Sequence, residues 1–150
     1  MNELLILNEY RDRLRSLRRA LEELEERKTS IRSCLSGTGG RTQSGRPGAY
    51  FEDVVAKYEN VYSEYVDTTN DYINVKNQIC RKIESLKKER YRNALFYRYV
   101  CGCTVTAAMK ECGYTGERGF YRLLKSANEE YERVYGNGTN TIYSSRNEDV

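Results

Sequence analysis

The sequence predicts an all-α fold, in which a long antiparallel helical hairpin with coiled-coil character is followed by a C-terminal helix-turn-helix. Two long segments carry apolar residues at alternating steps of three and four, and a glycine-rich stretch connects them. Three shorter helical patterns separated by glycines follow. We therefore expect a hairpin at 1–89 with a flexible link at 36–49, a helix-turn-helix at 90–135 and a disordered tail at 136–150.

The first predicted helix covers residues 2–35 and has an apolar seam along its whole length. The seam comprises Leu7, Tyr10, Leu14, Leu17, Leu21, Leu24, Lys28, Ile31 and Leu35. Between the seam positions, five arginines in the stretch 11–19 precede four glutamates in the stretch 22–26. One basic and one acidic block favour antiparallel self-pairing or a partner of reversed charge, and a solvated outer face of an intramolecular hairpin explains them equally well.

The second predicted helix runs from about Tyr50 to Leu86 and matches the first in length, which favours an antiparallel hairpin. Its seam comprises Phe51, Val55, Tyr58, Tyr62, Tyr65, Thr69, Tyr72, Ile79, Ile83 and Leu86, widened by Val54, Val61 and Val75. Residues 50–80 carry six acidic and two basic side chains. Because such a surface repels phosphate, we expect its tyrosines to pack inside the hairpin. No helix-breaking residue follows before 92, so this helix is expected to continue into the C-terminal part.

The stretch 90–135 has the order of a helix-turn-helix preceded by a further helix. A helix at about 90–100 ends before Gly102, and Thr104 offers the N-cap of a second helix. That second helix ends at Gly113, because glycine best tolerates the left-handed conformation at a helix end. Thr115 then supplies a hydroxyl cap for a third helix. This order is typical of proteins that place the last helix in a DNA major groove, and a plain three-helix bundle is the alternative.

The third helix of this stretch is expected to have two opposite faces. Its apolar face comprises Phe120, Leu123, Leu124, Ala127, Tyr131 and Val134, which recur at steps of three and four. Its other side carries Arg118, Tyr121, Arg122 and Lys125. Residues 81–125 contain eleven Lys and Arg against four Asp and Glu, a balance of +7 in a chain of net charge +3. Such a basic segment favours phosphate contact over a plain bundle.

The motifs Arg90-Tyr-Arg-Asn-Ala-Leu-Phe-Tyr-Arg-Tyr-Val-Cys-Gly102, Gly113-Tyr-Thr115 and Tyr121-Arg-Leu123, together with Thr104, resemble one protein family. This is the family of RinA- and ArpU-like late transcriptional activators of phages of Gram-positive bacteria, whose C-terminal part is similar to the promoter-binding fourth region of sigma factors. The stretch from Leu35-Ser-Gly37 to Gly48 is similar to the family's link between its first two helices. The resemblance implies a sequence-specific double-stranded DNA-binding transcriptional regulator of phage or prophage genes.

The expected DNA contacts lie on the third helix and around it. Arg118 and Arg122 are the candidates for bidentate guanine contacts, and Tyr121 for a thymine methyl group or a phosphate. Contacts to backbone phosphates are expected from Lys125, Lys110, Arg92, Arg90 and Thr115. Gly116 and Gly119 either remove bulk where the helix start meets DNA or belong to a poorly optimised surface.

No arrangement of residues typical of catalysis or of cofactor binding is present in the sequence. The chain has no histidine, which removes the commonest general base. It has five cysteines, of which Cys80, Cys101, Cys103 and Cys112 match none of the usual zinc-binding spacings. No apolar run reaches the length of a membrane span. We therefore expect a cytoplasmic protein that is not an enzyme and binds neither a metal nor a cofactor.

Two other functions are compatible with the same features. A DNA-packaging component of phage, similar to a small terminase subunit, also joins a helix-turn-helix to helical oligomerisation elements. A coiled-coil adaptor would instead use the basic C-terminal domain to bind an acidic protein. In the regulator, the hairpin would serve homodimerisation through the long helices or contact with RNA polymerase. The sequence leaves open whether the long helices pair within one chain or between two.

Overall fold

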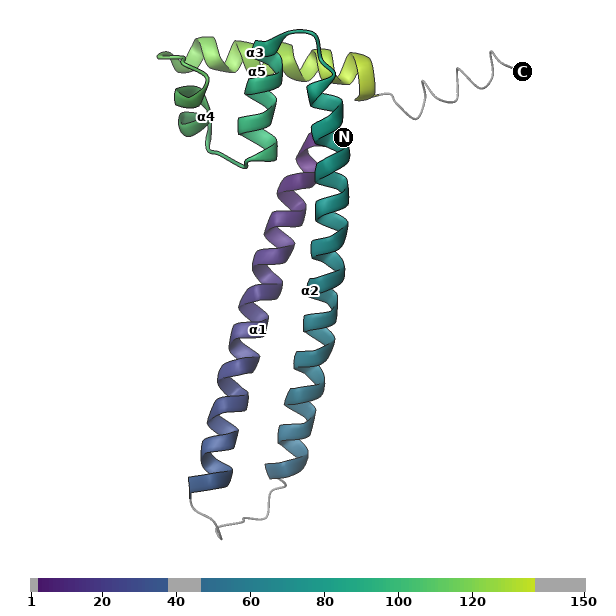
Figure 1. Ribbon diagram of the computed structural model, residues 1–150. Coiled ribbons are helices and arrows are strands. Elements are labelled where there is room, and N and C mark those ends of the chain that lie inside the picture. The colour runs from purple at the N-terminus through teal and green to yellow at the C-terminus, as the bar shows by residue number, and fades with distance from the viewer. Residues whose placement is uncertain (1–2, 38–46, 137–150) are drawn as a thin grey trace, which may run out of the picture. The chain divides into compact units, whose positions relative to one another are not determined.

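The computed structural model describes residues 3–37 and 47–136, except for the side chains of 34–37 and 47–49, and all its regular elements are helical (Figure 1). The elements are the 3₁₀ turn η1 (Glu3–Leu5), the α-helices α1 (Ile6–Gly37), α2 (Pro47–Glu84), α3 (Glu89–Leu95), α4 (Val105–Glu111) and α5 (Glu117–Tyr131), and the π-helical turns η2 (Phe96–Val100) and η3 (Glu132–Gly136). The predicted all-α fold, with a long packed helical pair followed by shorter helices, is confirmed. None of the described helices is long and apolar enough to cross a membrane.

The predicted link at 36–49 is shorter in the structure, because α1 continues to Gly37 and α2 begins at Pro47. Proline suits the first turn of a helix, where its missing N–H has no helical partner. Residues 38–46 and the tail from 137 onward lie outside the described residues, so the flexibility expected of both stays a prediction. Gly136 was expected in that tail and instead ends η3.

Contacts between residues divide the chain into two units. The hairpin unit is Tyr10–Asp71, and the C-terminal unit combines Met1–Glu9 with Tyr72–Val150. Within the hairpin unit α1 and α2 lie side by side (Figure 1). The long helices therefore pair within one chain.

The seam of α2 in the hairpin unit differs from the predicted one. Val54 is only 2% exposed and Thr68 7%, whereas Tyr62 is 52% exposed. The buried and half-buried line comprises Val54, Tyr58, Val61, Tyr65 and Thr68. The expectation that Tyr62 belongs to the seam is wrong, and Val55 and Thr69 lie only at its margin. The predicted Tyr58 and Tyr65 do lie in this line. Adjacent helical residues are about 100° apart, so Val55, Tyr62 and Thr69 each lie one step around the helix from Val54, Val61 and Thr68.

The seam of α1 includes a lysine, as the sequence predicts. The Lys28 side chain is only 17% exposed, and its ammonium lies 4.0 Å from the centre of the Tyr58 ring. The same ammonium pairs with Glu25 at 3.1 Å. The aliphatic part of the lysine packs in the seam while its charge meets a ring and a carboxylate. A charged residue is thereby accommodated at an apolar heptad position.

The C-terminal unit has a core that includes the first residues of the chain. One cluster of buried residues comprises Leu4, Leu7, Ile79, Ile83, Leu86, Leu95, Val100, Ala127 and Tyr131. The buried Tyr131 hydroxyl donates a hydrogen bond to Glu3 Oε1 at 2.9 Å, and the Lys82 ammonium donates to the same oxygen at 2.8 Å. Burial, and then the Glu3 carboxylate, raise the pKa of Tyr131. The N-terminal turn thus helps to hold the end of α5.

The expected continuity of the second long helix into the C-terminal part is wrong, because α2 ends at Glu84 and α3 begins at Glu89. Leu86 lies in the connection and is only 4% exposed. The Arg92 guanidinium donates hydrogen bonds to the carbonyls of Leu86 and Lys87, at 2.6 and 3.0 Å. Burial of one apolar side chain and satisfaction of two free carbonyls explain why the chain leaves the helix here without a glycine or proline.

Candidate nucleic-acid interface

The helix α4 and the turn after it have the local structure that the sequence predicts. Thr104 is the N-cap of α4, and its hydroxyl oxygen accepts the N–H of Ala107 at 3.2 Å. Gly113 has a φ of 77°, in the left-handed region, and its N–H donates to the carbonyl of Lys110 at 3.1 Å. The predicted cap and the predicted glycine turn are both confirmed. Together they end α4 sharply and direct the chain into α5.

The start of α5 differs from the prediction in its cap. The N-cap is Gly116, whose backbone is extended and whose carbonyl accepts the N–H of Phe120 at 3.2 Å. No side chain caps this end, so the predicted hydroxyl cap from Thr115 is wrong. The helix begins one residue too late for Thr115 to occupy the capping position. Its first N–H groups therefore have no side-chain cap and are available to water or to a ligand.

The apolar face predicted for α5 is buried, with one exception. The buried residues are Phe120, Leu123, Leu124, Ala127 and Tyr131. Val134 is 36% exposed, so its predicted place on this face is wrong. The α-helix ends at Tyr131 and continues as η3, which has more residues per turn. The shift in phase turns Tyr135 towards the core in place of Val134.

A second cluster of buried residues holds the first half of α5 against α3 and α4. It comprises Ala94, Ala108, Met109, Phe120, Leu123 and Leu124. The Tyr114 ring from the turn meets the Phe120 ring edge-on, with 5.8 Å between the ring centres. Three elements thus fix the orientation of α5, and with it the direction in which its outer side chains point.

The residues predicted to contact DNA on α5 lie on one side of the helix. At about 100° per residue, Arg118, Tyr121, Arg122 and Lys125 fall within an arc of about 100°, opposite the buried face. All four side chains are exposed, Tyr121 to 53%. We call these four residues the basic face of α5. Its outward position relative to the core agrees with the sequence analysis.

Three arginines of the C-terminal unit have partners within the chain. The guanidinium of Arg92 holds the carbonyls between α2 and α3, as described above. Arg98 donates to the carbonyl of Cys103 at 3.0 Å. Arg133 pairs with Glu130 at 2.5 Å, and this hydrogen bond lowers the pKa of Glu130. Because its donors are in use, Arg92 has a structural role that the sequence analysis did not foresee.

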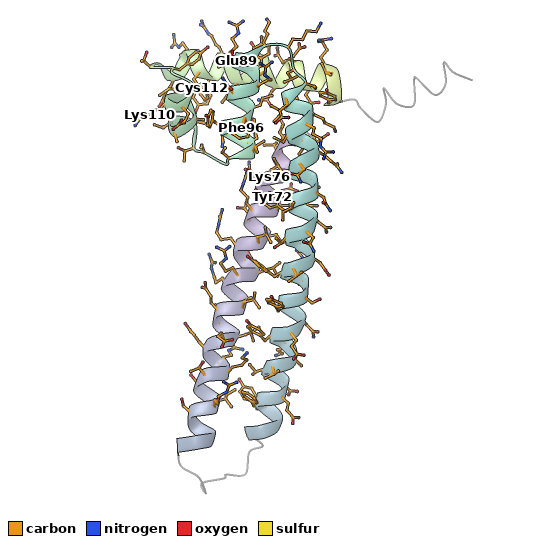
Figure 2. The ribbon with its side chains drawn as sticks, viewed as in Figure 1. Tyr72, Lys76, Glu89, Phe96, Lys110 and Cys112 are labelled. Atoms are coloured by element: carbon orange, nitrogen blue, oxygen red, sulfur yellow. The ribbon has the colours of Figure 1, made fainter. Side chains whose placement is uncertain are left out.

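The cations of the basic face have no such partners. Within the described part of the chain, Arg118, Arg122 and Lys125 form no ion pair and no side-chain hydrogen bond. Lys110 is likewise exposed and unpaired there, and Figure 2 shows it on α4. Thr115 is exposed in the turn before α5. Four positive charges around the α4–α5 turn are thus free to meet an anion.

Arg90 lies beside the same turn. A shallow hollow is lined by Glu89, Arg90, Asn93, Cys112, Tyr114 and Leu123, which come from α3, the end of α4 and α5. Figure 2 shows Glu89 and Cys112, which belong to this lining. The guanidinium of Arg90 is exposed and lies 5.5 Å from the centre of the Tyr91 ring. The structure therefore brings Arg90 close to the start of α5, at the flank of the basic face.

Two lysines that were not among the predicted DNA contacts lie near the second half of α5. Lys87 and Lys88 are exposed in the connection between α2 and α3. After the hydrogen bond from Arg133, the positive charges of Lys88 and Lys87 contribute to the lowered pKa of Glu130 on α5. They therefore lie near the second half of α5. The adjacent pair of lysines was a visible signal, but the expected continuous helix gave no reason to place it beside α5.

Two cysteines of the C-terminal unit are partly buried and favour the neutral thiol. Burial raises the pKa of both Cys80 and Cys112, which favours the thiol over the thiolate. Over residues 3–37 and 47–136, no group of three or more Cys, Asp and Glu residues is placed so that it could hold a metal ion.

No family model matches the chain, and no curated protein and no solved structure is significantly similar to it. The functional assignment therefore rests on the residues and on the geometry described above.

Proposed function

We propose that this chain is a sequence-specific double-stranded DNA-binding transcriptional regulator of phage or prophage type, in which α5 enters the major groove. The observation that carries the proposal is the division of α5 into two faces. One face is buried against α3 and α4, and the other presents unpaired cations and an exposed tyrosine. A helix fixed in this way after a tight glycine turn is what we expect of the second helix of a helix-turn-helix.

The chemistry of the basic face fits base recognition. Arg118 and Arg122 carry planar guanidinium groups, which match the two acceptors of guanine in the major groove. Tyr121 offers a ring for a thymine methyl group and a hydroxyl for a phosphate. Within the described residues neither arginine has a protein acceptor to lose on binding, so contact with DNA breaks no ion pair of the free protein.

Phosphate contacts would fix the orientation of α5 on the duplex. We assign them to Lys125, Lys110, Arg90 and Thr115, and we add Lys87 and Lys88. We leave Arg92 out of this set because its guanidinium holds two backbone carbonyls. The uncapped start of α5 adds backbone N–H groups and the positive end of the helix dipole.

The hairpin unit has a different role in this proposal. Residues 50–80, which lie in α2 and extend beyond the hairpin unit, carry a balance of −4, which disfavours phosphate contact along α2. We therefore assign the hairpin to contacts with protein, either RNA polymerase or a second copy. The RinA- and ArpU-like resemblance supports the same division between a helical N-terminal part and a DNA-binding C-terminal part. The proposal involves no catalytic step and no cofactor.

The first test is the affinity for a random-sequence DNA duplex, measured by fluorescence anisotropy at several salt concentrations. The wild-type protein should bind at low salt, with an affinity that falls steeply as salt rises. The double variant Arg118→Ala/Arg122→Ala should bind more weakly and show a shallower salt dependence, because two positive charges near the phosphates are lost.

A matched control removes the same charge elsewhere. Arg19→Ala/Arg27→Ala changes two exposed arginines of α1 and should bind random DNA like the wild type. Equal losses in both double variants would show that only the net charge matters and would contradict the assignment of the basic face. Absence of DNA binding at low salt, with retained affinity for an acidic protein, would favour the adaptor.

A further inference from the structure

The helix α2 has a second line of heptad positions besides the seam that packs on α1. This line, which we call the outer stripe, comprises Val55, Glu59, Tyr62, Val66, Thr69, Ile73, Lys76 and Cys80. Tyr62, Val66 and Ile73 are exposed to 52%, 38% and 47%. The stripe lies about 100° around the helix from the seam, and its steps alternate between four and three. Exposed apolar side chains at heptad spacing are typical of a helix surface that packs on another helix.

We propose that the outer stripe binds the outer stripe of a second copy of this chain, with the two α2 helices antiparallel. A twofold axis that passes between Asp67 and Thr68 brings each residue of the outer stripe opposite another stripe residue of the second copy. Val66 then faces Thr69 of the second copy, and Tyr62 faces Ile73 of the second copy. Each layer occurs twice because of the twofold symmetry.

The charges of the stripe select this arrangement. Glu59 and Lys76 are its only charged residues, and they lie at equal distances along the chain from the centre, so each faces the other across the pair. Within the described residues neither has an ion-pair partner in its own chain, and the Lys76 ammonium lies 5.6 Å from the centre of the Tyr72 ring (Figure 2). A parallel pairing would instead place like charges together.

The residues beside the outer stripe permit the close approach of a second helix. The positions beside it, on the side away from α1, are Ala56, Ser63, Asn70 and Asn77, and none of them is charged. In the same antiparallel register Ala56 lies near Asn77 of the second copy and Ser63 near Asn70, each two residues from the directly opposite position. The exposed acidic residues Asp67 and Asp71 lie further around the helix. The two acidic helices can therefore meet along this line without repulsion between their carboxylates.

This interface is distinct from the seam and independent of DNA binding. The seam is filled by α1 of the same chain, so it offers no surface to a second copy. The proposal therefore does not rest on the proposed function, and each can fail without the other.

Sedimentation equilibrium without DNA tests the proposal, with the full chain at concentrations up to about 100 μM. The wild type should reach twice the 17.5 kDa chain mass. Ile73→Glu should weaken dimerisation by about a hundredfold, because two apolar side chains lose their burial. Ile73 is exposed in the single chain, so helicity should stay unchanged, which circular dichroism checks. A wild type that stays monomeric, or a dimer that Ile73→Glu leaves intact, would overturn the proposal.

A charge exchange tests the antiparallel register. Glu59→Lys and Lys76→Glu should each weaken the dimer by roughly tenfold, because two opposite-charge pairs become like-charge pairs. The double variant Glu59→Lys/Lys76→Glu should regain dimerisation to within about threefold of the wild type, because opposite charges face each other again. Asp71→Lys makes the same charge change away from the stripe and should have no comparable effect. Failure of the double variant to recover would overturn the antiparallel register.

Discussion

The role of each arginine in the C-terminal unit is decided by the acceptors around it. Arg92 and Arg98 donate to backbone carbonyls that the breaks between helices leave free. Arg118 lies in the first turn of α5 and Arg122 in the second, where the nearby carbonyls accept N–H groups of the helix itself. In the sequence these four arginines are equivalent. Only the position of the helix ends separates the arginines that donate to backbone carbonyls from those whose side chains form no hydrogen bond within the described residues.

The Arg122→Ala variant tests whether the Arg122 side chain contacts a base or only a phosphate. On a selected DNA site the variant should lose roughly 1 to 3 kcal/mol of binding free energy, because a bidentate guanine contact is removed. On a random duplex the loss should be smaller, since only one charge is lost. Anisotropy titrations on both duplexes measure the difference. An equal loss on both would reassign Arg122 to a phosphate contact.

The Arg92→Ala variant should be less stable than the wild type. Its two hydrogen bonds to the carbonyls of Leu86 and Lys87 disappear, and the free energy of unfolding should fall by about 2 kcal/mol. Urea denaturation followed by circular dichroism measures the change. Arg90→Ala is the matched control and should leave stability nearly unchanged, because its side chain is exposed. If Arg92→Ala were as stable as the wild type, the structural role of Arg92 would be refuted.

At the scale of elements, the register of α2 shows where sequence patterns become ambiguous. Val54 and Val55 are adjacent, as are Val61 and Tyr62, and either member of each pair completes a heptad with Tyr58 and Tyr65. The packed helix α1 selects the first member of each pair and leaves the second outside. The existence of the helix was therefore predictable, whereas its rotation about its own axis was not.

This register predicts that two neighbouring valines contribute different amounts to the free energy of unfolding. Val54→Ala should lower the free energy of unfolding by about 2 kcal/mol, because the side chain is almost fully buried in the seam. Val55→Ala removes the same atoms from a half-buried position and should cost less than about 1 kcal/mol. Urea denaturation at low micromolar concentration measures both. A larger loss for Val55→Ala would restore the register that the sequence analysis chose.

The link between η1 and α5 predicts a dependence on alkaline pH. The pKa of Tyr131 is raised by burial and then by Glu3, whereas in the unfolded chain a tyrosine has a pKa of about 10. The unfolded state therefore releases this proton first. The stability that the neutral phenol contributes is complete below about pH 10 and is lost as the pH rises above it.

The Tyr131→Phe variant isolates this effect, because phenylalanine keeps the ring and cannot ionise. Between pH 9 and about pH 11 the wild type should lose more unfolding free energy than the variant does. Denaturation by urea at each pH measures the two slopes. Identical slopes would show that Tyr131 does not control the alkaline stability of the C-terminal unit.

At the scale of the whole molecule, the hairpin and the shorter helices after it were predictable because each rests on long periodic patterns or on glycines with a specific backbone role. Heptads identified α1 and α2, and Thr104 and Gly113 identified the ends of α4. The break after Glu84 was not predictable, because it depends on the burial of Leu86 and on a hydrogen bond from Arg92, six residues further along, to the Leu86 carbonyl. The same break places Lys87 and Lys88 beside α5, which is why these two candidates for DNA contact were missed.

The two proposals assign different surfaces to different partners. The basic face of α5 would bind DNA, and the outer stripe of α2 would bind a second copy of the chain. A dimer formed in this way presents two α5 helices, so its operator should contain two related half-sites. The spacing of those half-sites depends on the placement of the two units and is itself a quantity to be measured.

The central claim, that the basic face of α5 reads DNA sequence, is tested most directly by selection of bound duplexes from a randomised library at moderate salt. The wild type and the control Arg19→Ala/Arg27→Ala should enrich the same short motif, with guanines at fixed positions. The variant Arg118→Ala/Arg122→Ala should enrich none. Enrichment of the same motif by that variant, or no motif with the wild-type protein, would contradict the account.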